Sequence, residues 1–396
     1  MSSAFSKIPK WFVGDIIIPF VITRVALLLV AWVGFHLLPL LVTFPSAWEI
    51  GRDGNKHAVV NHISPNDHPW INMLSRWDAG WYVDIARDGY QFQPGFPSNA
   101  AFFPLYPLLL RAVHAPLFLP QNDYWWLVTA IAISNMVLLI GLTYFRALVA
   151  LDLDSEIASR AVTYLLIFPT SFFLSSVYSE SLFLALTVGA FYYARKEQWL
   201  LACSFAALGT LTRSQGIIVV LPLLIEYLSQ RSFSLRKVGW NITAFALIPA
   251  ALLAFALFLK LKFGNWTVIF DVQGTWGRRL MWPWHPLAWF LRHAPSLSPE
   301  HHDKLDFCFL LLLLAAAIVG LRQLRPSYSV YLWTAVTFFS CWGMFGSIPR
   351  FDLVIFPLFI VLALIGNRTI RLGYIVVSSM LAALFMLMHS RWNWVA

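Results

Sequence analysis

One short segment places an acidic side chain among aromatic rings. Residues 76–82 read RWDAGWY, so Asp78 is flanked by indole and phenol side chains. Rings of this size partly exclude water, and a carboxylate in such surroundings can act as a general base toward a hydroxyl group. The alternative role is structural, because carboxylates at helix starts cap free N–H groups. Asp78 is the first candidate for catalysis, with Asp53 and Asp67 as reserve acids.

Four arginines could hold an anion on the same side of the protein. Arg350 and Arg213 lead, because each lies at the outer end of a predicted membrane helix, and Arg278 and Arg279 in a long connecting segment are close competitors. A guanidinium group presents a planar fork of donors that matches phosphate oxygens. The alternative is that these arginines pair with Glu180, with Asp271 or with lipid headgroups.

The histidines and cysteines do not indicate a metal site. No pair of histidines has ligand spacing with carboxylates, and His301 and His302 adjoin Glu300 and Asp303 in a stretch that we expect to be solvated. The cysteines lie inside apolar runs, where each behaves as a small hydrophobic residue. We therefore expect no metal ion and no cofactor.

The composition requires a membrane around these residues. Of the 396 residues, 59% are hydrophobic and 12% are charged, which leaves too little polar surface for a soluble globular protein. The net charge of +9 is scattered in short clusters between apolar runs, so it reflects membrane topology and not a nucleic-acid surface. We predict an all-α, polytopic transmembrane protein that forms one membrane module over residues 1–396.

About eleven apolar stretches are candidate spans, since crossing roughly 30 Å of hydrocarbon takes about 20 residues. They are Ile16–Val42, Tyr124–Leu148, Ile157–Val177, Ser181–Ala194, Trp199–Leu211, Gly216–Leu228, Val238–Leu259, Leu305–Leu321, Tyr328–Phe345, Leu353–Ile365 and Leu372–Met388. Basic clusters fall on alternate connections, so the face that carries them is predicted to be cytoplasmic. The opposite, non-cytoplasmic face receives two long segments, residues 44–123 and 260–304.

The first of these long segments is predicted to contain interfacial helices. Residues 79–88 have apolar side chains at helical spacing, with Asp78 at the helix start and Gly89 at its end. The apolar stretch Phe102–Leu119 is broken by three prolines, which suits a helix along the membrane interface better than another span.

These motifs resemble the PIG-V-like family, which comprises the glycosylphosphatidylinositol mannosyltransferase II group and its bacterial relatives, within the GT-C class of membrane glycosyltransferases. The family pattern of WD, an aromatic pair, IA, GY and AFFPLYP is met at Trp77, Asp78, Trp81, Tyr82, Ile85, Ala86, Gly89, Tyr90 and Ala101–Pro107. Further matches are Tyr178–Ser181, Thr212–Gly216, Gln273, Trp276, Arg278 and Pro349–Phe351.

The resemblance implies that one hexose, with mannose expected, is transferred from a polyprenyl-phosphate donor to a glycan or glycolipid acceptor with inversion. It implies Asp78 as the general base and Arg350, Arg213 and Arg278 as ligands of the donor phosphate. Residues expected to contact substrate, or to support those that do, are Trp77, Tyr82, Tyr106, Tyr178, Glu180, Gln215, Gln273 and Trp276. A nucleotide-sugar donor is disfavoured, because the sequence has no glycine-rich phosphate loop.

A second hypothesis is a transporter or flippase for a lipid-linked sugar, with Asp78, Glu180, Arg213 and Arg350 along its path. Two observations weigh against it. The long loops are predicted on one face, and the sequence shows no internal repeat of the kind that many transporters have. The expected location is a multi-pass position in a bacterial plasma membrane or a eukaryotic endoplasmic reticulum, with the active site on the non-cytoplasmic face. The expected partners are the lipid-linked donor, the acceptor and membrane lipids, without nucleic acid.

Overall fold

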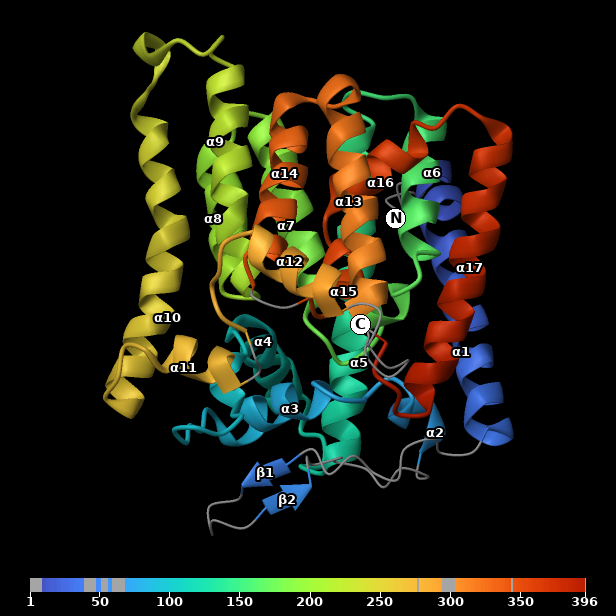
Figure 1. Ribbon diagram of the computed structural model, residues 1–396, viewed down its shortest axis with the longest axis vertical. Helices are drawn as coiled ribbons and strands as arrows, with labels where there is room; N and C mark the ends of the chain where they lie inside the picture. The colour runs from blue at the N-terminus through green and yellow to red at the C-terminus, as the bar shows by residue number, and fades with distance from the viewer. Residues whose placement is uncertain are drawn as a thin grey trace, which may run out of the picture.

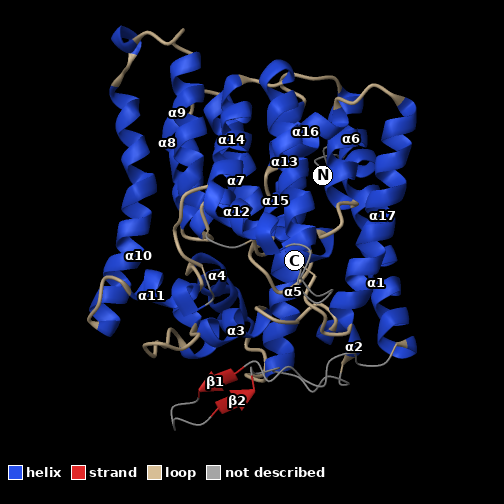
Figure 2. Ribbon diagram, in the orientation of Figure 1, coloured by secondary structure: helices blue, strands red, loops and turns tan. Residues whose placement is uncertain are grey.

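The computed structural model describes residues 9–38, 48–50, 56–58, 68–275, 278–293, 303–342 and 345–395. Most of these residues are helical, as Figure 2 shows by colour. Two short strands, β1 (Trp48–Ile50) and β2 (Lys56–Ala58), pair in antiparallel fashion. The predicted all-α fold is therefore confirmed for the described residues, apart from this hairpin.

Among the described residues, five helices are long and apolar enough to cross a membrane. Each overlaps one of the predicted spans, and a helix of about 20 residues matches roughly 30 Å of hydrocarbon. They are η1 (Phe12–Ile17) with α1 (Ile18–Leu37), α5 (Asp123–Val149), η7 (Trp240–Ala246) with α10 (Leu247–Phe263), α13 (Asp303–Gln323) and α17 (Arg368–Ser390).

The remaining predicted spans contain shorter helices, so eleven spans of full length are not confirmed. These helices are α6 (Ser155–Leu166), α7 (Glu180–Arg195), α8 (Trp199–Thr210), η5 (Ser214–Val219) with α9 (Val220–Ser229), α14 (Pro326–Ser340) and α16 (Phe356–Ala363). The span predicted over residues 157–177 is interrupted, because α6 ends at Leu166 before Pro169, and the 3-10 helix η4 (Ser171–Leu174) follows.

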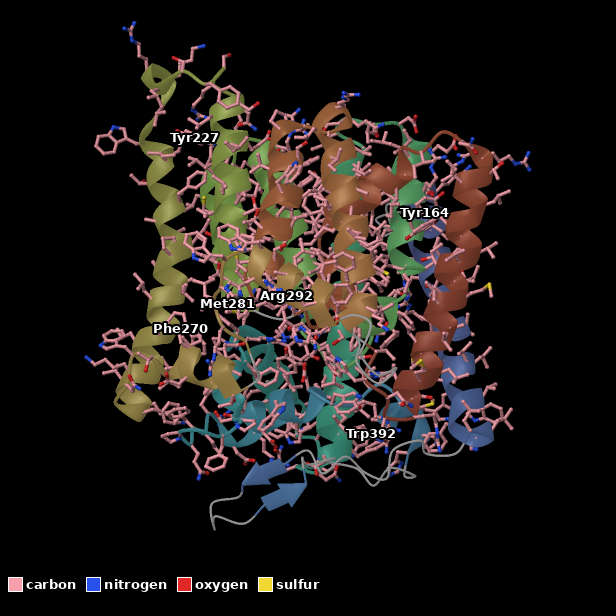
Figure 3. All side chains as sticks on the ribbon, in the orientation of Figure 1. Tyr164, Tyr227, Phe270, Met281, Arg292 and Trp392 are labelled. Atoms are coloured by element: carbon pink, nitrogen blue, oxygen red, sulfur yellow. The ribbon has the colours of Figure 1, made fainter. Side chains whose placement is uncertain are left out.

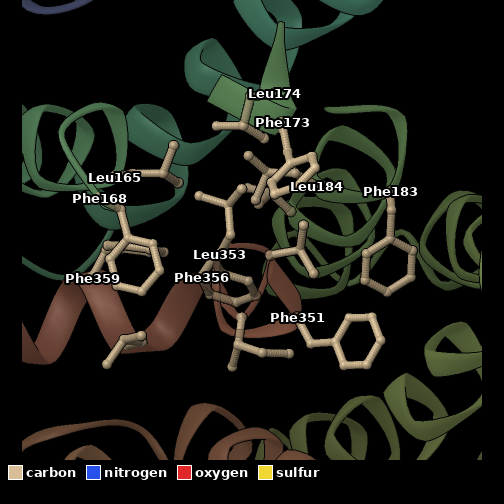
Figure 4. Packing of buried hydrophobic residues seen from close by; sticks show 14 of the residues in the cluster. Leu165, Phe168, Phe173, Leu174, Phe183, Leu184, Phe351, Leu353, Phe356 and Phe359 are labelled. Carbon is tan, nitrogen blue, oxygen red and sulfur yellow. The ribbon is translucent and has the colours of Figure 1, made fainter. Parts of the chain in front are cut away.

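Burial inside the protein explains why a short helix can be as apolar as a span. Every side chain of α7 from Glu180 to Phe191 is buried, so the surroundings of this helix are other helices. Helix α5 lies close against α7, where a methyl group added at Gly141 would come within 3.2 Å of the Ala185 Cα. Figure 4 shows phenylalanines of the surrounding core, including Phe168 and Phe359, whose rings meet edge to face at 5.3 Å.

The two ends of the bundle differ in their connections (Figure 1). The turns from α9 to α10, from α13 to α14 and from α16 to α17 lie at one end, and the 3-10 helix η6 (Leu235–Lys237) belongs to the first of these turns. The long connections lie toward the other end. They contain α2 (Pro69–Asn72), α3 (Ala79–Asp88), η2 (Asn99–Ala101), α4 (Leu105–His114), η3 (Ala115–Leu117), α11 (Val268–Thr275), α12 (Trp284–His293) and, between α14 and α16, α15 (Ile348–Asp352).

Candidate active site

Asp78 lies at the position predicted for it but does not act as a helix cap. Helix α3 begins at Ala79 and ends before Gly89, whose φ of 86° lies in the left-handed region that glycine favours. The Asp78 side chain makes no cap hydrogen bond to α3. The capping prediction is therefore wrong, because Oδ2 of Asp78 instead accepts a hydrogen bond from Nη1 of Arg350 at 2.6 Å.

Arg350 also joins Asp78 to a buried glutamate. Its Nε donates to Oε1 of Glu180, and Nη1 of Arg213 donates to the same oxygen. Arg213 is fixed further by Gln215, whose Oε1 accepts from the Arg213 Nε at 2.8 Å. All three charged side chains are buried. Removing one member of such a cluster leaves an uncompensated charge, so its members hold one another in place.

Arg278 reaches the same place without an acidic partner. Its Nη1 donates to Oε1 of Gln273 at 3.4 Å, and its guanidinium group lies 5.9 Å from the ring of Trp342 and 5.7 Å from that of Phe351. Among the described residues it forms no ion pair with a carboxylate. Burial lowers the pKa of Arg278 to about 10, and the nearby Asp78 opposes that decrease, so the side chain is charged at neutral pH.

These side chains surround one pocket of about 600 Å³, its open mouth included. Helix α3, the stretch before α4, the turn before η5, α11 and α15 all contribute to its wall. The lining residues are Asp78, Tyr82, Ala101, Phe102, Phe103, Thr212, Arg213, Ser214, Gln215, Gln273, Arg278, Arg350 and Phe351. Three arginines and two carboxylates meet here, if Glu180 behind the wall is included, so one positive charge is in excess.

Tyr82, Tyr106 and Tyr178, the tyrosines named as site residues, differ in how they lie relative to the pocket. Tyr82 lines the pocket, and its hydroxyl lies 2.9 Å from Oγ of Ser179. Burial raises the pKa of Tyr82 to about 12, with a further increase caused by Glu180, so its hydroxyl stays neutral. Tyr106 packs behind Tyr82 with ring centroids 5.1 Å apart. Tyr178 donates from its hydroxyl to the carbonyl of Arg76 at 2.8 Å and accepts from the Asp78 amide at 3.3 Å.

Trp77 faces away from the pocket. It has a φ of 56°, which is uncommon for a residue with a bulky side chain. Its ring lies 5.8 Å from that of Trp392 and 5.5 Å from that of Trp394. Trp77 is not among the residues that line the pocket, and its packing against Trp392 and Trp394 suits the supporting role that was the other half of the expectation.

The sequence-based predictions missed Arg76 and the segment Ser390–Trp394. Arg76 is fully buried, donates from Nη2 to the carbonyl of Ser390 at 3.0 Å, and lies 4.5 Å from the Trp392 ring, which Figure 3 labels. Through Arg76 and Trp77, this segment holds the turn that carries Asp78. The only signal in the sequence was the basic residue directly before the Trp-Asp pair.

Some predicted residues lie outside the described part of the chain, namely Trp276, Asp53 and Asp67. Within the described part, no group of three or more His, Cys, Asp or Glu side chains could hold a metal ion.

Comparisons with known proteins identify relatives of this chain. Residues 49–269 match the family described as Mannosyltransferase (PIG-V). The chain is 31% identical over 157 residues to the GPI alpha-1,6-mannosyltransferase 2 of Cricetulus griseus, an alignment that covers 38% of this chain and 31% of that protein. The chain thus matches less than a third of that relative's length.

Solved structures to which this chain is similar include oligosaccharyltransferases of Archaeoglobus fulgidus. The apo form has a TM-score of 0.45 and 12% sequence identity, covering 99% of this chain and 57% of that one. The complex of AglB with an inhibitory peptide and a dolichol-phosphate has a TM-score of 0.43 and 12% identity, covering 98% and 56% of the two chains.

Proposed function

Because this chain belongs to the Mannosyltransferase (PIG-V) family, we propose that it is a membrane glycosyltransferase that transfers a mannosyl group from a polyprenyl-phosphate donor to a lipid-linked or extracytoplasmic acceptor. The observation that carries the proposal is one pocket in which Asp78 faces three arginines, one of them without an acidic partner. Such a pocket supplies a proton acceptor and a cationic site for a departing phosphate.

In the proposed reaction Asp78 is the general base. Its Oδ2 accepts from Arg350, and among the described residues no hydrogen bond is made to Oδ1, which leaves that oxygen for the acceptor hydroxyl. The hydroxyl proton passes to Asp78 as the hydroxyl oxygen forms a bond with the anomeric carbon. The bond from that carbon to the phosphate oxygen breaks, and the polyprenyl phosphate departs with the electron pair. Attack on the face opposite the phosphate inverts the anomeric centre.

The structure favours Arg278 over Arg350 and Arg213 as the main phosphate ligand. Both of the latter are bonded to Glu180, and Arg350 also holds Asp78, so their charges are already balanced. Arg278 can bind an anion without breaking an existing ion pair. A guanidinium group placed where charge develops stabilises the leaving phosphate in the transition state. We therefore assign the positioning of Asp78 to Arg350 and the binding of phosphate to Arg278.

The proposed active site faces the non-cytoplasmic side. The pocket lies toward the long connections at one end of the bundle, whereas short connections with basic residues, such as η6 (Leu235–Lys237), lie at the other. Basic residues near short loops favour the cytoplasmic face. A lipid-linked donor in the opposite leaflet would then present its phosphate to Arg278.

The test is a transfer assay on purified protein in liposomes, with radiolabelled polyprenyl-phosphate-mannose and a panel of lipid acceptors. We expect a mannosylated lipid product, and none when GDP-mannose replaces the lipid-linked donor. Movement of the donor across the bilayer is measured on the same preparation. Translocation without transfer would show a flippase and contradict the proposal.

A further inference from the structure

Residues 278–293, which contain α12 (Trp284–His293), form a segment with two unlike faces. We call it the α12 segment. One side is fastened to the helix bundle and the pocket, and the other exposes large apolar side chains. In the chain it lies between α10 and α13, two helices of spanning length, with α11 preceding it.

The inward side makes specific contacts. The amide of Met281, which Figure 3 labels, donates to the carbonyl of Cys341 at 2.8 Å. The buried ring of Phe290 stacks on Phe307 with centroids 4.6 Å apart. Arg278, at the start of the segment, lines the pocket beside Asp78 and Arg350. Movement of this segment would therefore displace the arginine that has no acidic partner.

The outward side is too apolar to face water. Leu280 is 89% exposed, Trp282 68% and Trp284 60%, and the rings of the two tryptophans stack at 5.2 Å. Within α12, the exposed residues Trp284, Leu287 and Leu291 stand at positions i, i+3 and i+7, which share one helix face. His285, Trp289 and Arg292 are also exposed and project from a different part of the helix circumference, which therefore combines two basic side chains with one tryptophan.

We propose that this apolar face lies in the lipid leaflet beside the pocket, and that the prenyl chain of the donor reaches the site along it. The occupant is a lipid leaflet and not a protein, because α10 and α13, which come before and after the segment in the chain, are long and apolar enough to span a membrane and expose apolar side chains of their own, Leu261 and Leu311 among them. An amphipathic helix with an apolar face and a basic polar side is typical of the headgroup boundary.

The donor part of the proposal rests on the proposed function. Arg278 faces the pocket, and Leu280, two residues later, faces outward. A prenyl chain lying against Leu280, Trp282 and Trp284 would have its phosphate at the level of Arg278. The α12 segment would thus bind the prenyl chain of one donor lipid on its outward side and the phosphate of the same lipid on its inward side.

The first experiment locates the face and does not depend on activity. Cys203, Cys308 and Cys341 are replaced by alanine, and a nitroxide label is attached at Leu287→Cys or, as the matched control, at His285→Cys. In lipid nanodiscs, we expect the label at position 287 to collide mainly with dissolved oxygen and the label at position 285 mainly with a water-soluble nickel chelate. Equal access of the nickel chelate to both positions would overturn the lipid placement.

The second experiment tests donor access. The double variant Trp282→Ser/Trp284→Ser should raise the KM for a long-chain donor by roughly tenfold, since apolar contact area with the chain is lost, while the KM for a short, water-soluble donor stays unchanged. Trp240→Ser removes an exposed tryptophan at the other end of α10 and serves as the control. An equal rise for both donors would contradict the proposed path of the chain. Absence of transfer by the wild-type protein would overturn the proposed function and leave the nitroxide result standing.

Discussion

Two buried glutamates lie near the two ends of α7, and each is bonded to two arginines. Glu180 begins α7 and binds Arg213 and Arg350. Glu226, on α9, binds Arg325 at 2.9 Å and is 3.4 Å from Arg195 at the end of α7. By residue type and burial the two clusters are almost the same.

The two clusters differ in the hydrogen bonds made by the second carboxylate oxygen of each glutamate. The second oxygen of Glu226 accepts from Oγ of Ser327 at 2.6 Å, so this cluster is satisfied and ties α7, α9 and α14 together. The second oxygen of Glu180 has no hydrogen-bond partner among the described residues, and its arginine Arg350 extends to Asp78 at the pocket. A buried glutamate paired with two arginines can therefore serve only to stabilise the packing of helices. The cluster at Glu180 differs in that Arg278, which has no acidic partner among the described residues, lies in the same pocket.

The largest effect should come from neutralising each glutamate in turn. Glu180→Gln and Glu226→Gln should both destabilise the protein by about 3–5 kcal/mol, because each leaves buried arginines without their acid. Thermal unfolding in detergent measures this loss. Transfer per folded molecule should fall steeply only in Glu180→Gln, because Arg350 then loses the contact that aims it at Asp78. Equal loss of transfer in the two variants would remove the distinction between the clusters.

Arg278→Ala should weaken donor binding by roughly 2–5 kcal/mol, by analogy with truncating one partner of a buried charge pair. Thermal stability should change little, because Arg278 forms no ion pair with a described carboxylate. Equilibrium binding of radiolabelled donor measures the effect. Arg279→Ala, at an exposed neighbouring position, is the control and should bind donor normally. Unchanged donor binding by Arg278→Ala would return the phosphate role to Arg213 or Arg350.

Arg350→Lys keeps the positive charge but loses the guanidinium group, whose Nε and Nη1 bond Glu180 and Asp78. A lost hydrogen bond to a charged group costs about 1.5–3 kcal/mol, so we expect turnover to fall at least about tenfold. Donor affinity should change less than in Arg278→Ala, since Arg350 is assigned to position Asp78. The comparison of kcat with donor KM checks this. A rise in donor KM with normal kcat would make Arg350 a phosphate ligand instead.

The smallest effect is expected at Trp392. Trp392→Leu removes the aromatic partner of the Arg76 guanidinium, a contact worth about 0.5–2 kcal/mol. The turn that carries Asp78 should be less well fixed, so kcat should fall several-fold while donor KM stays the same. Steady-state kinetics with saturating acceptor separates the two parameters. A change in donor KM alone would contradict a positioning role for this segment.

The sequence alone predicts features that depend on residues close to one another in the chain, such as the bounds of a helix. The bounds of α3 follow from local spacing and from Gly89, and both agree with the structure. The pairing of Asp78 with Arg350 joins residues 272 positions apart and could not be inferred from either motif alone. For the same reason Arg350 and Arg213 ranked above Arg278, because only the folded chain shows which arginines are already paired. The sequence does not give the number of spans, because an apolar helix such as α7 can be surrounded either by other helices or by lipid.

The most direct test of the account is Asp78→Asn, compared with Asp88→Asn at the exposed end of the same helix. The amide keeps the volume of the carboxylate and an oxygen for Arg350 but cannot take up the acceptor proton. Loss of a positioned base costs about 10²–10⁴-fold, so we expect transfer to fall by that factor while donor binding is retained, and Asp88→Asn to behave as the wild type. Near-normal transfer by Asp78→Asn would contradict the assignment of Asp78 as the base.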